Sequence, residues 1–106
     1  MAVTDKSWDG SPSKYPNTNS FCSACLIDTN KPGEDKVQAN CKLPIREPNG
    51  DINKNALGAA SAALAGARGG LKDVSPADKK KAARALMKAY SEAQMPPPPS
   101  LKNMAQ

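Results

Sequence analysis

The stretch SPADKKKAARALMKAYSEA, residues 75 to 93, constrains the fold more than any other part of the chain. Ser75 is a favoured N-cap residue, Pro76 suits the first helical position, and Asp78 stands where a capping box places its acidic side chain. The residues that follow carry apolar side chains at helical spacing along one side: Ala82, Ala83, Leu86, Met87, Tyr90 and Ala93. We therefore predict a helix from about residue 75 to residue 94.

A helix that precedes it is predicted from about residue 53 to residue 67, in NKNALGAASAALAGA. Asp51 or Asn53 can cap its N-terminus, and the RGG that follows is typical of a helix end. The two leucines of this segment lie two turns apart on one side, among small residues that permit close packing. We expect the two helices to form a hairpin, with these side chains at the interface: Leu57, Leu64, Leu86 and Tyr90.

The two ends of the chain lack helical or strand periodicity, and most of the ten prolines lie toward them. Residues 1–20 are polar and interrupted by turn-forming glycine and proline, with Trp8 and Tyr15 as aromatic anchors. Residues 96–106 begin with four prolines, which favour an extended polyproline II segment, and continue with Leu101 and Met104. We expect two extended arms whose anchors, Trp8, Tyr15, Leu101 and Met104, contact other subunits.

The segment between the N-terminal arm and the helices contains a turn signal. The stretches SFCSACLID and KVQANCKLPI flank TNKPGEDK, in which Pro32 and Gly33 favour a turn. This pattern predicts a short two-stranded hairpin or loop with Cys25 and Cys41 near each other. The predicted fold class is therefore mostly α: a helical hairpin with a short N-terminal β-hairpin or loop and extended N- and C-terminal arms. The predicted domains are an arm over residues 1–20, a small helical domain over 21–95 and a proline-rich arm over 96–106.

Three cysteines raise the question of a metal or redox site. Cys22 and Cys25 have the spacing of half a zinc site and Cys41 could supply a third ligand, but the chain has no histidine and no fourth cysteine. A zinc ion would need Asp28, Asp35 or a second chain as well, and a redox pair of Cys22 and Cys25 is a further alternative. Because the chain starts without a hydrophobic segment of the signal-peptide kind, we expect a reducing compartment, where structural disulfides are rare. We predict partly buried free thiols near one another, and no bound zinc or other cofactor.

The second predicted helix carries a basic run, Lys79, Lys80 and Lys81 with Arg84 and Lys88, and all of these but Lys79 are expected on its outer face. Cations in the first turn of a helix oppose the helix macrodipole, which favours a use for them. With a net charge of +5, the chain has candidate contacts for phosphates or for an acidic protein surface in Lys80, Lys81, Arg84 and Lys88. The alternative is an ordinary solvated helix face.

Two classes of function are disfavoured by what the sequence contains. No apolar run approaches the roughly 20 residues that a membrane span needs, so we expect no membrane partner. The chain has no histidine, and none of its carboxylates stands beside a nucleophile in a recognisable motif. We therefore expect it not to be an enzyme.

From Cys41 onward, about half of the chain resembles a module found in tailed-phage and prophage head gene clusters. That module occurs as a small protein or attached to prohead maturation proteases, and its pattern runs KLP, (R/K)EPxG, NxNA, an alanine-rich helix ending in GARGG, and a helix with KxxAAxxLxxxYxEA. The matching residues are Lys42, Leu43, Pro44, Arg46, Glu47, Pro48, Gly50, Asn53, Asn55, Ala56, Gly66 to Gly70 and Lys80 to Ala93. Relatives often carry CxxC followed by CHLP. Here Lys42 stands where a histidine would be, which argues further against zinc.

The resemblance implies a role in the virion or in head assembly. We expect a non-enzymatic minor capsid or decoration (cement) protein of a tailed-phage head, made in the host cytoplasm and present in multiple copies on the particle. Its partner would be the major capsid protein or another head protein. The alternative is a nucleic-acid-binding or head-assembly accessory module that uses the lysine-rich helix face. A third hypothesis is an accessory that guides the maturation protease to its substrate.

Overall fold

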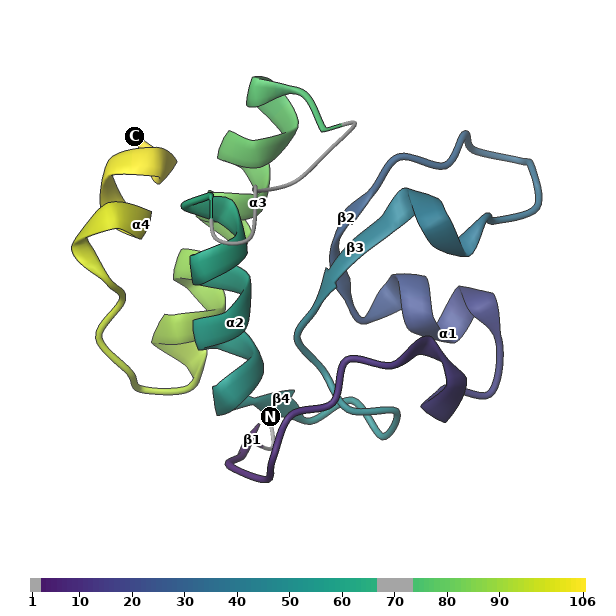
Figure 1. The fold of residues 1–106 in the computed structure, drawn as a ribbon, viewed down its shortest axis with the longest axis horizontal. Helices are drawn as coiled ribbons and strands as arrows, with labels where there is room; N and C mark the ends of the chain where they lie inside the picture. Colours follow the sequence, from purple (N-terminus) through teal and green to yellow (C-terminus); the bar gives the residue numbers. More distant parts are fainter. Residues whose placement is uncertain (1–2, 67–73) are drawn as a thin grey trace.

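The computed structural model describes residues 3–66 and 74–106 of the 106-residue chain. This described part contains four α-helices and four short strands (Figure 1). The helices are α1 (Thr18–Ser23), α2 (Lys54–Leu64), α3 (Pro76–Glu92) and α4 (Pro99–Ala105). The strands are β1 (Val3–Thr4), β2 (Cys25–Asp28), β3 (Cys41–Pro44) and β4 (Ile52–Asn53), and short 3-10 helices cover Pro12–Lys14 and Gln38–Asn40.

The strands form two separate two-stranded sheets. β1 runs parallel to β4, with Val3 opposite Ile52, so the N-terminal segment is attached to the residues that lead into α2. β2 runs antiparallel to β3, with Asp28 opposite Cys41. The short two-stranded hairpin predicted in this part of the chain is therefore present.

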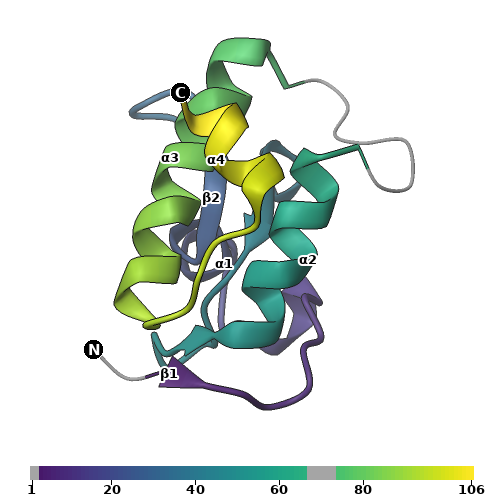
Figure 2. The same ribbon diagram turned by 90° about the vertical axis from the view of Figure 1, so that its left-hand side faces the viewer.

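The main hydrophobic core lies between α2, α3 and α4, with β2 behind them (Figure 2). Its largest fully buried apolar side chains are Ile52, Leu57, Leu86 and Leu101. Inside this core the hydroxyl oxygens of Ser61 and Tyr90 lie 3.0 Å apart and share a hydrogen bond between α2 and α3. The side chains predicted at the interface of the two helices, Leu57, Leu64, Leu86 and Tyr90, are all buried in this core.

A smaller hydrophobic cluster lies on the other side of the molecule, around α1 and β3 (Figure 1). Its buried members are Tyr15, Phe21, Cys22, Ala24 and Cys41. The rings of Tyr15 and Phe21 pack edge to face, with centroids 5.3 Å apart and an interplanar angle of 70°. This cluster positions the cysteines that the sequence singled out.

The helix starts follow the capping residues predicted from the sequence. The Ser75 side chain accepts a hydrogen bond from the backbone N–H of Asp78 at 3.1 Å. The Asn53 side chain accepts from the N–H groups of Asn55 and Ala56 at 2.8 and 3.1 Å. α2 ends at Leu64, earlier than predicted, and the RGG expected to end it lies within residues 67–73, outside the described residues.

The predicted fold class, a helical hairpin with extended arms, is wrong. α2 and α3 lie where two helices were expected, but in the described residues they belong to an arrangement of four helices and two small sheets. Within the predicted arm, residues 3–20 are not extended throughout, because they supply β1, a 3-10 helix and the start of α1. α1 has only six residues, too few for a helical period to be recognised. Its N-cap is Asn17, whose side chain accepts from the Ser20 N–H at 2.8 Å.

The C-terminal segment is not an extended arm either. The prolines lead into α4, with Pro98 as the N-cap and Pro99 at the first helical position, where the fixed φ of proline fits a helix. Leu101 is 1% exposed and Met104 is half-buried, because both pack into the main core beside α3. The expectation that Leu101 and Met104 are anchors on an extended arm is therefore wrong.

Candidate functional site

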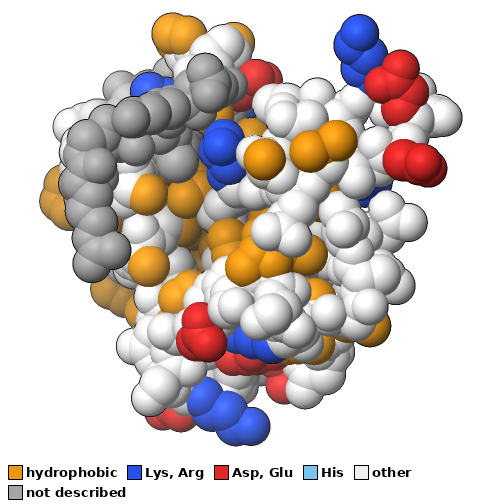
Figure 3. Space-filling model, turned by 45° about the vertical axis from the view of Figure 1, so that its right-hand side comes forward, with side chains coloured by type: hydrophobic (Ala, Val, Ile, Leu, Met, Phe, Trp, Pro, Cys, Tyr) orange, Lys and Arg blue, Asp and Glu red, His pale blue; other side chains and the backbone are white. Residues whose placement is uncertain are grey.

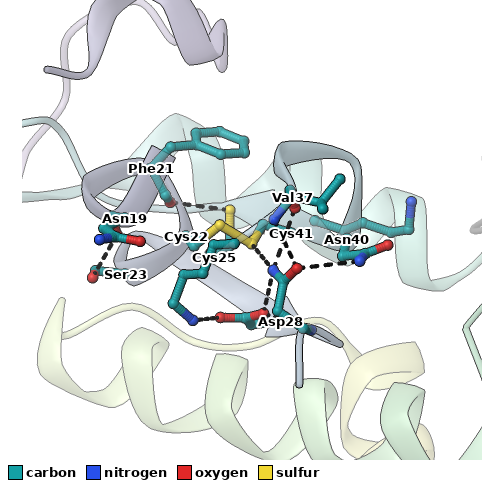
Figure 4. The surroundings of a disulfide bond; sticks show 12 residues. Asn19, Phe21, Cys22, Ser23, Cys25, Asp28, Val37, Asn40 and Cys41 are labelled. Atoms are coloured by element: carbon teal, nitrogen blue, oxygen red, sulfur yellow. Dashed lines mark hydrogen bonds and ion pairs between the residues drawn. A yellow bond between two sulfur atoms is a disulfide. The ribbon is translucent and has the colours of Figure 1, made fainter. Parts of the chain in front are cut away.

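A cysteine cluster lies where α1, β2 and β3 meet (Figure 4). Cys22, in the last turn of α1, and Cys41, the first residue of β3, form a disulfide with Cα atoms 5.2 Å apart. The prediction of free thiols without a structural disulfide is therefore wrong for these two residues. It rested on the expected compartment, whereas the pairing follows from the chain reversal between α1 and β2, which places the end of α1 against β3. Cys25 is a free thiol.

The Cys25 thiol is poorly suited to nucleophilic chemistry. It is half-buried, and its Sγ donates a hydrogen bond to the backbone carbonyl of Phe21 at 3.3 Å. Burial, together with the negative charge of Asp28, raises the pKa of Cys25 to about 12. Because the thiolate is the reactive form of cysteine, this group stays protonated and unreactive at neutral pH.

Asp28 brings a carboxylate to the disulfide. It is the last residue of β2 and pairs with Cys41 across the sheet. A hydrogen bond from the Lys36 ammonium, with further bonds from Asn30, holds the pKa of Asp28 below its usual value despite some burial. One Asp28 oxygen accepts from the Asn30 backbone N–H at 2.9 Å and from its side-chain amide at 2.8 Å. One oxygen of Asp28 and the sulfurs of Cys22 and Cys41 all lie within 4.8 Å of one another.

The side chain of Asn30 orders the loop between β2 and β3 through hydrogen bonds to residues on both sides of it. Its Oδ1 accepts from the Val37 backbone N–H at 2.8 Å and from the Asn40 side chain at 3.2 Å. Its Nδ2 donates to the Val37 carbonyl and to the Cys41 sulfur, each at 3.3 Å. The loop is therefore fixed at its base, next to the disulfide.

A second polar centre is formed by residues of the REPNGDINKN stretch. The Asn53 side chain is fully buried, and its Nδ2 donates to the Lys6 carbonyl at 3.1 Å and to the Glu47 carboxylate at 2.8 Å. The other Glu47 oxygen accepts from the Lys14 ammonium at 3.1 Å. Although burial raises the pKa of Glu47, these bonds from Asn53 and Lys14 bring it below its usual value.

Asn55 strengthens the same centre from the first turn of α2. Its side-chain amide donates to the backbone carbonyls of Asp5 and Lys6 at 3.0 and 2.7 Å. The sharp turn before β4 uses Gly50, whose φ of +96° lies in a region that favours glycine. Four residues of the module's pattern thus join the N-terminal segment, a turn and the start of α2: Glu47, Gly50, Asn53 and Asn55. Sequence reasoning missed this network because its partners lie far apart in the chain.

The predicted basic residues lie on the outer side of α3. Lys80, Lys81, Arg84 and Lys88 are all exposed. The Arg84 Nε also donates to the Ala105 carbonyl at 2.9 Å, which ties it to the end of α4. On the face shown in Figure 3, hydrophobic side chains gather near the centre and charged side chains are scattered. By their exposure, Lys80, Lys81 and Lys88 form a local charged face on α3.

A groove of about 250 Å³ lies between α3 and the start of β2. Cys25 and Leu26 line one side, and Lys88 and Glu92 line the other. The Arg46 guanidinium, also in the lining, lies 3.7 Å from the Glu92 carboxylate. The groove brings together two residues singled out from the sequence, Cys25 and Lys88. Its lining residues do not include a pair of groups arranged for proton transfer to a bound molecule.

The predicted aromatic anchors face the protein's own interior. Trp8 is half-buried, and the Lys14 ammonium lies 4.1 Å from the centre of its ring. Tyr15 is buried and donates its hydroxyl to the Arg46 carbonyl, and burial raises its pKa to about 12. Trp8, Tyr15, Leu101 and Met104 are thus used inside the chain, so they are not freely available to a partner. Lys80, Lys81 and Lys88 are the predicted contacts that stand open at the surface.

Comparisons with known proteins return no match: no family model, no curated protein and no solved structure matches this chain. The resemblance to the phage head module therefore rests only on the sequence residues set out above. None of the helices in residues 3–66 and 74–106 is long and apolar enough to cross a membrane.

Proposed function

We propose that this chain is a non-enzymatic structural protein of a tailed-phage head, a minor capsid or decoration protein. It binds the major capsid protein or another head protein and is present in multiple copies on the particle. The contact is made by the outer side of α3, where Lys80, Lys81 and Lys88 are exposed, and not by the two ends of the chain. The ends are occupied with internal contacts through β1 and α4.

The observation that carries the proposal is what the residues of the resembling pattern do. The polar side-chain atoms of Glu47, Asn53 and Asn55 form hydrogen bonds within the chain. Glu47 accepts from Lys14 and Asn53, Asn53 also donates to the Lys6 carbonyl, and Asn55 donates to the Asp5 carbonyl. Residues that form such internal hydrogen bonds hold the scaffold together and keep its helices in place. The exposed lysines of α3 then provide the long, charged side chains that can reach acidic groups on a neighbouring subunit.

The proposal is tested on heads purified from the phage or prophage that carries this gene. Immunoblotting of density-gradient fractions should find the protein in the head fraction, at a fixed ratio to the major capsid protein. Its absence from purified heads, with the protein present in the lysate, would refute the structural role.

A charge-reversal pair tests the binding face. The double variant Lys80→Glu/Lys88→Glu should lose occupancy on heads, because it reverses two of the exposed cations on α3. Lys31→Glu/Lys54→Glu is the matched control, since it makes the same change of charge at two exposed lysines elsewhere. Equal occupancy of the two double variants would rule out the α3 face as the contact. Far-UV circular dichroism of each variant shows whether its helices are retained.

A nucleic-acid-binding or assembly accessory role is the second candidate. Lys80, Arg84 and Lys88 follow one another at intervals of four residues, which places them in a row along α3. Such a row can follow a phosphate backbone, and each phosphate that it neutralises steepens the dependence of binding on salt. Fluorescence anisotropy with a labelled duplex at two salt concentrations distinguishes the two candidates. Binding that weakens steeply with salt and is lost in Lys80→Glu/Lys88→Glu would favour nucleic acid.

A further inference from the structure

We propose that Cys22, Asp28 and Cys41 form a zinc site that becomes available when the Cys22–Cys41 disulfide is reduced. The three residues come from three different elements: the last turn of α1, the end of β2 and the start of β3. Their two sulfurs and one carboxylate oxygen lie within 4.8 Å of one another. This inference is independent of the proposed role in the phage head.

The distances fit a tetrahedral ion after a small movement. Zinc binds thiolate at about 2.3 Å and carboxylate oxygen at about 2.0–2.2 Å, so two sulfurs on one ion stand ~3.8 Å apart. Reduction frees the Cys22 and Cys41 sulfurs to separate by rotation about their Cα–Cβ bonds, while their Cα atoms stay near 5.2 Å. Asp28 already faces Cys41 across the β2–β3 pair. The exposure of Asp28 leaves room for water as a fourth ligand.

The surroundings supply the charge and the hydrogen bonds that such ligands need. Asp28 is held as a carboxylate by Lys36 and Asn30. The Asn30 amide, which also donates to the Cys41 sulfur at 3.3 Å, would stabilise a thiolate there. Two thiolates and a carboxylate form a donor set that suits zinc among the common divalent ions.

The redox step balances with an external dithiol as the reductant. The dithiol transfers two electrons and two protons to the Cys22–Cys41 disulfide and becomes a disulfide itself. Zinc then displaces the two thiol protons and binds both thiolates. The two sulfurs cannot form a disulfide and bind zinc as thiolates at the same time. Oxidation and zinc binding therefore exclude each other. On this proposal, the expectation of no bound zinc applies to the oxidised chain alone.

Cys25 provides the matched control. The group of potential ligands does not include it, and its thiol is turned toward the Phe21 carbonyl. A zinc knuckle read from the spacing of Cys22 and Cys25 would require Cys25, whereas the site proposed here requires Asp28. The two arrangements therefore predict opposite results for the same pair of variants.

The test is a zinc titration of the full chain against a chromophoric chelator, after reduction with a phosphine and again after oxidation. The reduced protein should bind one zinc per chain, and the oxidised protein none. Asp28→Asn should weaken zinc binding by about tenfold or more, and Cys41→Ser should abolish it. Cys25→Ser and Asp35→Asn should bind as the parent does.

Three results would overturn the proposal: no zinc bound by the reduced protein, zinc bound equally by the oxidised protein, or loss of binding in Cys25→Ser with Asp28→Asn unaffected. Cadmium substitution supplies a second readout, since its thiolate charge-transfer absorption reports coordination by sulfur. Asp28 is exposed, so Asp28→Asn keeps the test decisive even where Cys41→Ser fails to fold.

Discussion

Replacing Leu101 with alanine tests whether α4 is an integral part of the core. Leu101 is 1% exposed and belongs to the main hydrophobic cluster, together with residues of α2 and α3. A Leu→Ala change at a buried site costs about 2–5 kcal/mol, according to how far the surroundings collapse into the space. Domains are stable by about 5–15 kcal/mol, and small ones are the more marginal, so this cost is a large share of the total.

The position of α4 at the end of the described fold limits that cost. α4 has seven residues, too few to persist as a helix without its contacts. If Leu101→Ala removes more free energy than the docking of α4 contributes, α4 detaches from the core. The free energy of unfolding then falls no further. Deletion of residues 99–106 measures the free energy that the docking of α4 contributes, which is the largest loss the substitution can cause. We expect Leu101→Ala to cost about 2–3 kcal/mol and the deletion to cost at least as much.

Urea unfolding followed by far-UV circular dichroism measures both changes. Lys102→Ala is the control, because it alters an exposed residue of the same helix and should stay within about 0.5 kcal/mol of the parent. An unchanged free energy of unfolding in Leu101→Ala would show that α4 does not dock. The C-terminal part of the fold described above would then be incorrect.

The polar centre, the end of α3 and the disulfide each allow a further test. The lowered pKa of Glu47 makes its contribution to stability complete above its usual value of 4.5 and lost as the pH falls below it. Glu47→Gln should therefore flatten the loss of thermal stability on acidification, and an unaltered pH profile would contradict this role. Gln94 has a φ of 58°, so Gln94→Gly should raise the free energy of unfolding by about 0.5–1 kcal/mol, measured in urea. Cys22→Ser/Cys41→Ser should lower it by about 2–4 kcal/mol, whereas an equal loss in Cys25→Ser would argue against the observed pairing.

Local signals in the sequence were sufficient for the two longer helices. Ser75 caps α3 as predicted, and Asn53, one of the two predicted candidates, caps α2. Such caps can be predicted because an N-cap depends on backbone groups only two or three residues away. α4 was missed because the run of four prolines at residues 96–99 favours an extended segment, and the seven residues of α4 show too little periodicity to outweigh it. What decides in favour of a helix is the apolar surface of α3, onto which Leu101 packs. No local pattern contains that information.

The candidate site was predictable only in part, for a similar reason. Exposed lysines on one helix face follow from helical periodicity, and Lys80, Lys81 and Lys88 are exposed. The network around Asn53 joins it to the Lys6 carbonyl, 47 residues away, and the disulfide joins cysteines 19 residues apart. Such pairings depend on how the elements pack. A spacing rule that compares near neighbours therefore favours Cys22 with Cys25 over Cys22 with Cys41.

The separation of the apolar side chains into two clusters bears on how the protein opens. The main cluster holds α2, α3 and α4 together, whereas the smaller one surrounds the Cys22–Cys41 bond. Cooperative units of this kind unfold locally at different free energies. Breaking the bond removes a covalent restraint from the smaller unit and leaves the contacts of the larger unit in place. A contact that α3 makes with a neighbouring subunit would thus persist whether the Cys22–Cys41 bond is intact or broken.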